Sequence, residues 1–151
     1  MADLFGNATC KLDEKHRLTL PSKLIKQLEG SDDNGQFIVK PNLKKPCIDL
    51  YPKENWDEIM QKLKKLDRFR PDVQEYLIRF LKGHELVYLD KANRLLLPTR
   101  LINYSKIDKE VIVAPIIDMV QIWDVTLYEQ YTQLPENFDE LTNSALDKKD
   151  E

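Results

Sequence analysis

An aspartate and an arginine four residues apart occur twice in this chain, as Asp13 with Arg17 and as Asp90 with Arg94. An aspartate at the start of a tight turn accepts a hydrogen bond from a backbone N–H two residues later, so Asp13 and Asp90 are predicted to structure their turns. The arginine that follows carries a planar fork of donors that suits a guanine edge or a phosphate. Each turn is therefore predicted to project a guanidinium group from a rigid base.

The position before the arginine is His16 in one turn and Asn93 in the other. Tight turns often need one residue with positive φ, and Asn and His are among the few residues other than glycine that are enriched there. We therefore expect both residues to adopt the left-handed conformation. Lys15 and Lys91 lie beside the same turns and suit phosphate contacts, which position a protein on DNA.

Two other interpretations fit a single Asp-x-x-x-Arg pentapeptide. Its two charges can form a surface ion pair worth about 0–1 kcal/mol and nothing more. The two aspartates can also be imagined as the paired carboxylates of a hydrolase. Each aspartate has its own arginine, however, and the four glycines, two cysteines and two histidines show no phosphate-loop or metal-site spacing. We therefore predict that the chain is not an enzyme and has no metal site and no cofactor.

The turns belong to a longer internal repeat. Residues Gly6–Ile25 align with residues Gly83–Ile102 without a gap, and nine of these 20 pairs are identical. Later segments also correspond, for example Phe37–Pro41 with Val111–Pro115, and the length differences fall in loops, where insertions are tolerated. Each half is predicted to contain, in order, a strand, a turn, a strand, a helix, two strands and a helix. This order predicts an α+β fold with a first repeat over 1–66, a linking helix over 67–82, a second repeat over 83–131 and an acidic tail over 132–151.

Helix starts are predicted from proline and asparagine. Pro21, Pro98 and Pro71 are expected to begin helices, because a first-turn position does not need the missing N–H. Asn55 is expected to cap a helix over 56–66. The acidic stretch from Asn137 onwards, which is poor in apolar residues, is expected to be a weak helix that fades into disorder.

The formal net charge of −3 hides an uneven distribution. Residues 1–28 carry five basic and three acidic side chains, residues 84–106 carry four and two, and residues 129–151 carry two and seven. A basic patch can bind phosphate while the whole protein stays acidic. The first residues show no secretory signal pattern, and the longest apolar runs, such as 111–117, are too short to span a bilayer, so no membrane association is expected.

The segments LDEKHRLTLPSKL and LDKANRLLLPTRL, with LYPKENWDEI after the first and QIWDVTLYEQ after the second, closely resemble the MraZ family. The resemblance runs from about residue 4 to residue 131 and implies two tandem pseudo-repeats of an AbrB-like swapped-hairpin β-barrel with short flanking helices. It also implies a homo-oligomer in the form of a closed ring, whose Asp-x-x-x-Arg turns line a surface that faces double-stranded DNA. The resemblance further implies that the chain binds short G-rich direct repeats in the promoter of the division and cell-wall gene cluster, and that it is found in the cytoplasm and nucleoid.

The family usually has glycine where this chain has His16 and Asn93. Both replacements tolerate positive φ, so the turn is expected to keep its conformation. The added side chains are expected to affect how closely this backbone approaches DNA, and with it the operator preference. The resulting hypothesis is a sequence-specific DNA-binding transcriptional regulator. The alternative is a ring-forming protein-interaction scaffold in which the Asp–Arg pairs are only structural, and steep weakening by salt would distinguish DNA binding from it.

Overall fold

Short strands alternate with short helices along residues 3–29 and 35–147, which are the residues that this computed structural model describes. The strands are β1 (Ala8–Lys11), β2 (Arg17–Thr19), β3 (Gln36–Pro41), β4 (Ile48–Pro52), β5 (Glu85–Tyr88), β6 (Arg94–Leu96), β7 (Glu110–Ile116) and β8 (Met119–Asp124). The helices are α1 (Ser22–Leu28), α2 (Lys53–Lys64), α3 (Pro71–Leu81), α4 (Thr99–Ser105), α5 (Val125–Tyr131) and α6 (Phe138–Leu146). The mixed α+β class predicted from the repeat order is confirmed.

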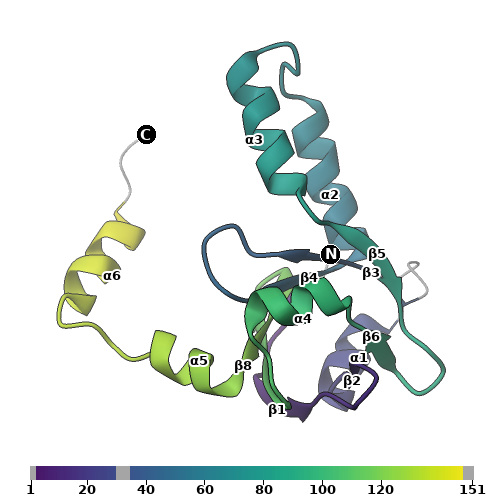
Figure 1. The fold of residues 1–151 in the computed structure, drawn as a ribbon. Coiled ribbons are helices and arrows are strands. Elements are labelled where there is room, and N and C mark those ends of the chain that lie inside the picture. The colour runs from purple at the N-terminus through teal and green to yellow at the C-terminus, as the bar shows by residue number, and fades with distance from the viewer. Residues whose placement is uncertain (1–2, 30–34, 148–151) are drawn as a thin grey trace.

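The strands form two antiparallel groups (Figure 1). Six of them make one sheet in the order β1-β7-β8-β4-β3-β5, and β2 and β6 make a separate two-stranded ribbon. Because β1 and β5 are the two edges of the larger sheet, the strands of the described residues do not close into the barrel that the resemblance implied.

Pairing between strands crosses from one half of the chain to the other. The first-half strand β1 pairs with β7, and the second-half strand β5 pairs with β3. The ribbon itself joins β2 from the first half to β6 from the second. The two halves are therefore interleaved through their hairpins, and neither turn lies on a hairpin that packs only within its own half.

The main core lies on one face of the six-stranded sheet. Along β3, Phe37 and Val39 point into this core, whereas Ile38 joins a second cluster on the other face, as strand alternation requires. Leu24 of α1 and Leu101 of α4 pack into the main core together with the buried residues of the ribbon. The ribbon and its turns are therefore held against a buried apolar layer.

Three helix starts agree with the proline positions, and one predicted cap is wrong. Pro21 and Pro98 are the N-caps of α1 and α4, one residue before the first helical residue, and Pro71 is the first residue of α3. Helix α2 begins at Lys53, so Asn55 lies inside it. Asn55 is buried and its side-chain amide donates to the Asp118 carbonyl at 2.6 Å, which outweighs its local preference for a cap.

The two halves continue differently after their last strands. Helices α2 and α3 lie side by side in Figure 1, and the Trp56 ring of α2 stacks on the Phe80 ring of α3 at 5.8 Å. Helix α6 stands apart from the sheet in the same view, and Leu141 on it is 55% exposed. The predicted tail helix thus forms over Phe138–Leu146. The disorder expected towards the end of the tail falls on positions that include 148–151, which lie outside the described residues. Within 3–29 and 35–147, every helix is too short or too polar to cross a membrane.

Candidate nucleic-acid interface

The first turn is closed by the carboxylate of Asp13. Its Oδ1 accepts hydrogen bonds from the backbone N–H groups of Lys15 at 2.9 Å and Arg17 at 2.8 Å, and its Oδ2 accepts from Arg17 Nε at 2.7 Å. His16 has φ +65°, the left-handed conformation predicted for it. One side chain therefore fixes both the path of the turn and the direction of the arginine.

The second turn repeats this arrangement. Asp90 Oδ1 accepts from the backbone N–H groups of Ala92 and Arg94, each at 2.9 Å, and Oδ2 accepts from Arg94 Nε at 2.9 Å. Asn93 has φ +60°, as predicted. The same geometry has formed on two different sets of tip residues, so it depends on the shared aspartate, the shared arginine and a residue that tolerates positive φ.

Both carboxylates are held in the ionised form. The pKa of Asp13 is lowered first by the backbone N–H of Arg17; desolvation opposes this lowering, and the Arg17 side chain and the Lys15 N–H add to it. The pKa of Asp90 is lowered in the same way, first by the backbone N–H of Arg94. An ionised carboxylate that already accepts three hydrogen bonds is a poor general base, which argues against the hydrolase interpretation.

Each turn arginine uses only one of its donor nitrogens within the described part of the chain. Arg17 and Arg94 bind their aspartates through Nε, and their side chains remain 32% and 33% exposed. Arg100 differs, because its Nη1 donates to the Gly83 carbonyl and its Nη2 donates to Glu85. The terminal nitrogens of the two turn arginines are therefore left for an external acceptor, while those of Arg100 are occupied.

The other half of the chain fixes the end of each turn. The carbonyl of His16 accepts from the N–H of Leu97 at 2.9 Å, and the carbonyl of Asn93 accepts from the N–H of Leu20 at 3.0 Å. These bonds extend the β2–β6 ribbon by one residue pair at each end. They pin the residue with positive φ next to each arginine, and sequence reasoning missed them because the partners are far apart in the chain.

Both arginines lie on the outer face of the ribbon. Leu18 is opposite Leu95, and both are fully buried. Since residues alternate between faces along a strand, Arg17 and Arg94, one residue before the leucines, point away from the core on the same side. Figure 1 shows β2 and β6 next to one another at the edge of the fold.

The remaining predicted residues surround these arginines. Lys15 and Lys91 are exposed at the tips of their turns. The ring of His16 contacts the second half, with its Nδ1 3.2 Å from the hydroxyl oxygen of Thr99. The structure therefore places all the predicted DNA-facing side chains at the ribbon or its two turns.

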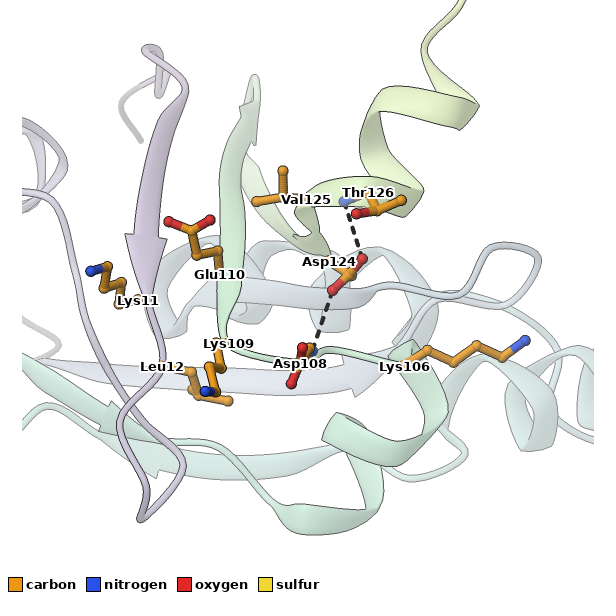
Figure 2. Close-up of a pocket in the computed structure, with 9 residues that line it drawn as sticks. All are labelled: Lys11, Leu12, Lys106, Asp108, Lys109, Glu110, Asp124, Val125 and Thr126. Carbon is orange, nitrogen blue, oxygen red and sulfur yellow. Dashed lines mark hydrogen bonds between the residues drawn. The ribbon is translucent and has the colours of Figure 1, made fainter.

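A hollow of about 690 Å³ lies beside the strand that enters the first turn (Figure 2). It is lined by lysines and carboxylates in equal number together with Leu12, Val125 and Thr126. Asp124 accepts from the backbone N–H groups of Asp108 and Thr126, so its carboxylate has a structural role. Within residues 3–29 and 35–147, no group of histidine, cysteine and carboxylate side chains is arranged to hold a metal ion. We therefore interpret the hollow as a solvated charged surface.

Comparison with known proteins identifies the family. The profile of the MraZ protein family, whose description likens it to antitoxins, matches this chain twice, over residues 4–77 and 80–149. A protein named transcriptional regulator MraZ from Christiangramia forsetii is 38% identical over 130 residues, covering 86% of this chain and 83% of that protein. Proteins of the same name from Flavobacterium psychrophilum and Desulforamulus reducens are 35% and 34% identical, over 86% and 94% of this chain and 82% and 96% of their own lengths. These matches confirm the family predicted from the sequence, and they agree with the prediction that the chain is not an enzyme, because its relatives are named as regulators.

Proposed function

Because the chain belongs to the MraZ family, we propose that it is a DNA-binding transcriptional regulator that reads its operator through the two Asp-x-x-x-Arg turns. The observation that carries this proposal is the shared geometry of Arg17 and Arg94. Each is fixed by its own aspartate through Nε, each keeps its terminal nitrogens unpaired within the described residues, and both face outward from one ribbon.

The ribbon has the right shape for the major groove. That groove is about 12 Å wide and admits a two-stranded β-ribbon. An arginine fork grips guanine at O6 and N7, and each such contact supplies about 1–3 kcal/mol of discrimination against the wrong base. Arg17 and Arg94 take this role, and G-rich sites are the expected targets.

The residues around the arginines supply the sequence-independent part of binding. Lys15 and Lys91 at the exposed tips contact phosphates and set the register on the duplex. His16 and Asn93, which replace the usual glycine, add side chains at the DNA-facing end of each turn. Asp13 and Asp90 stay behind the arginines as turn-formers.

Assembly raises the affinity of these individually weak contacts. A closed ring of identical chains presents several ribbons on one surface and engages several spaced direct repeats at once, so that avidity multiplies the single-site affinity. The exchange of strand partners between the halves, β1 with β7 and β5 with β3, supports the swapped-hairpin arrangement and the division into repeats over 1–66 and 83–131. The proposed targets are the promoter repeats of the division and cell-wall gene cluster, which places the protein in the cytoplasm and nucleoid.

A ring-forming protein scaffold remains the second candidate, since one observation favours it. Several large apolar side chains of the C-terminal part are exposed, including Leu134 at 73% and Leu146 at 73%. Exposed apolar residues grouped on one segment are typical of protein contacts. Helix α6, which carries Leu146, stands apart from the β2–β6 ribbon in Figure 1, so subunit contacts on this helix are compatible with DNA binding at the turns.

The Arg17→Ala, Arg94→Ala double variant tests the proposal. The probe is duplex DNA from upstream of the chain's own gene, and the control is Arg70→Ala, Arg79→Ala, which removes the same charge from exposed positions of the α2–α3 region. In a gel-shift assay we expect the turn variant to lose binding and the control to bind like the wild type, with equal thermal melting for all three. A turn variant that shifts the DNA as well as the wild type contradicts the proposal.

A further inference from the structure

Four side chains share the outer face of the β2–β6 ribbon. Arg17 is directly opposite Leu96, and Thr19 is directly opposite Arg94. Both pairs flank the buried Leu18–Leu95 pair, so all four side chains project away from the core. Thr19 and Leu96 are equivalent positions of the internal repeat, and the two arginines are equivalent as well.

Leu96 is an exposed leucine in an unusual setting. It is 60% exposed, although its neighbours Leu95 and Leu97 are almost fully buried. A single exposed leucine needs no explanation by itself. This one, however, has the outward-facing Arg17 across the ribbon and the outward-facing Arg94 two residues earlier on its own strand. An apolar group therefore lies next to two guanidinium groups whose terminal nitrogens have no partner among the described residues.

The spacing of this group matches neighbouring base pairs. Side chains directly opposite on a ribbon start about 4.5–5.5 Å apart, and side chains two apart on one strand start about 6.6 Å apart. Base steps along one strand of DNA are about 3.4 Å, so Leu96 lies within one or two base steps of either arginine. In the major groove the apolar feature available at that distance is the C5-methyl group of thymine.

We propose that Leu96 is a specificity-determining residue that contacts the methyl group of a thymine next to the guanines read by Arg17 and Arg94. This inference rests on the proposed DNA-binding function and adds a second base to it. Thr19 holds the equivalent place in the first half and offers only a single methyl group. The ribbon therefore has two matching arginines but unequal apolar contacts, which gives it a preferred direction on the duplex.

The test compares thymine with uracil, which differs only by the missing methyl group. Each thymine of the operator is replaced in turn by deoxyuridine, and the dissociation constants of both duplexes are measured for wild type and for Leu96→Ala. Burial of one methyl group is worth about three- to fivefold in affinity. We expect one position where the wild type binds the uracil duplex about three- to fivefold more weakly and where Leu96→Ala binds both duplexes equally.

Two controls make the outcome specific to this residue. Leu43→Ala removes an exposed leucine outside the ribbon and should keep the wild-type preference for thymine. Leu96→Thr, which copies the first-half residue, should retain part of the preference. Equal melting temperatures would show that all variants fold.

The inference is overturned if no thymine shows a methyl effect with the wild type, or if Leu96→Ala keeps the full effect. It is also overturned if Leu96→Ala leaves the thymine preference intact but lowers the mass of the assembly in light scattering, since Leu96 would then be a subunit contact. Failure of the proposed function looks different, because the Arg17→Ala, Arg94→Ala variant would then still bind the operator.

Discussion

The two turns have the same backbone and the same internal hydrogen bonds but different tips. In the first turn, Glu14 and Lys15 lie between the aspartate and His16, and the histidine ring contacts Thr99. In the second, Lys91 and Ala92 lie between the aspartate and Asn93. The aspartate and arginine that hold the turn are thus separate from the two residues after the aspartate, which differ between the tips, and a change at those two positions can alter DNA contacts without altering the position of the arginine.

Loss of the aspartate should have the largest effect on both turns. In Asp13→Ala and Asp90→Ala, two backbone N–H groups and the arginine Nε lose their acceptor, so the guanidinium is no longer aimed. We expect each single variant to bind operator DNA at least about tenfold more weakly and the double variant to fail to bind. Equilibrium titration of labelled duplex measures this.

The matched control is the asparagine variant at the same positions. Asp13→Asn keeps an oxygen for the backbone N–H groups and removes only the charge that faces Arg17. It should lose less binding than Asp13→Ala. If alanine and asparagine are equally damaging, the charge and not the turn geometry is what matters.

Substitution of the residue with positive φ should have the next largest effect. This effect should be on the stability of the fold. A β-branched side chain is strongly disfavoured at φ +65°, so His16→Val is expected to lower the free energy of unfolding by about 1–2 kcal/mol. His16→Gly removes this strain and should cost far less, although it also removes the contact with Thr99. Urea unfolding of His16→Val, His16→Gly and the corresponding Asn93 variants measures the series.

The series sharpens the comparison of the two turns. Asn93 has no side-chain bond to the first half that corresponds to the His16–Thr99 contact among the described residues. The glycine variant should therefore be better tolerated at position 93 than at position 16. Equal tolerance at both positions would show that the histidine contact adds nothing to stability.

The tip lysines should have a smaller effect that does not depend on sequence. Each phosphate contact that is lost reduces the slope of log affinity against log salt by about 0.9. Lys15→Ala and Lys91→Ala should therefore flatten the salt dependence and weaken operator and unrelated DNA alike. The effect should be greater for Lys91, because Glu14 next to Lys15 already offsets part of the charge in the first turn. A loss confined to operator DNA would show that a lysine reads bases.

Short-range features of the site could be predicted from the sequence. The Asp13–Arg17 bonds and the left-handed His16 lie within five consecutive residues, so local stereochemistry determines them. The same holds for the proline that precedes α1 and α4. The internal repeat then extended each local prediction to the second half.

Features that depend on distant partners could not be predicted in the same way. A repeat indicates that one unit occurs twice, but it does not tell whether hairpins pair within a half or between halves, and the bond from Leu97 to His16 depends on that choice. Asn55 was wrongly predicted as a cap because its partner, the Asp118 carbonyl, is 63 positions away. The outward position of Leu96 follows from strand alternation, yet its place next to both arginines required the register of β2 against β6.

Acid should cause the smallest change, and it should appear only at low pH. The pKa values of Asp13 and Asp90 are lower in the folded protein than their usual value, chiefly because backbone N–H groups of the following arginines bind the ionised form. A group with a lowered folded pKa contributes stability above its unfolded pKa of about 3.9 and loses that contribution as the pH falls through the folded value. The contribution of the two turns to the free energy of unfolding should therefore be constant from neutral pH to about pH 5 and should fall only below about pH 4.

Urea unfolding at a series of pH values measures this contribution. The matched variant is Asp13→Asn, Asp90→Asn, and its loss of stability below pH 4 should be smaller than that of the wild type. If the wild type and this variant lose stability in parallel, other carboxylates account for the acid sensitivity, and the two turns are held together by their backbone pairing across the ribbon.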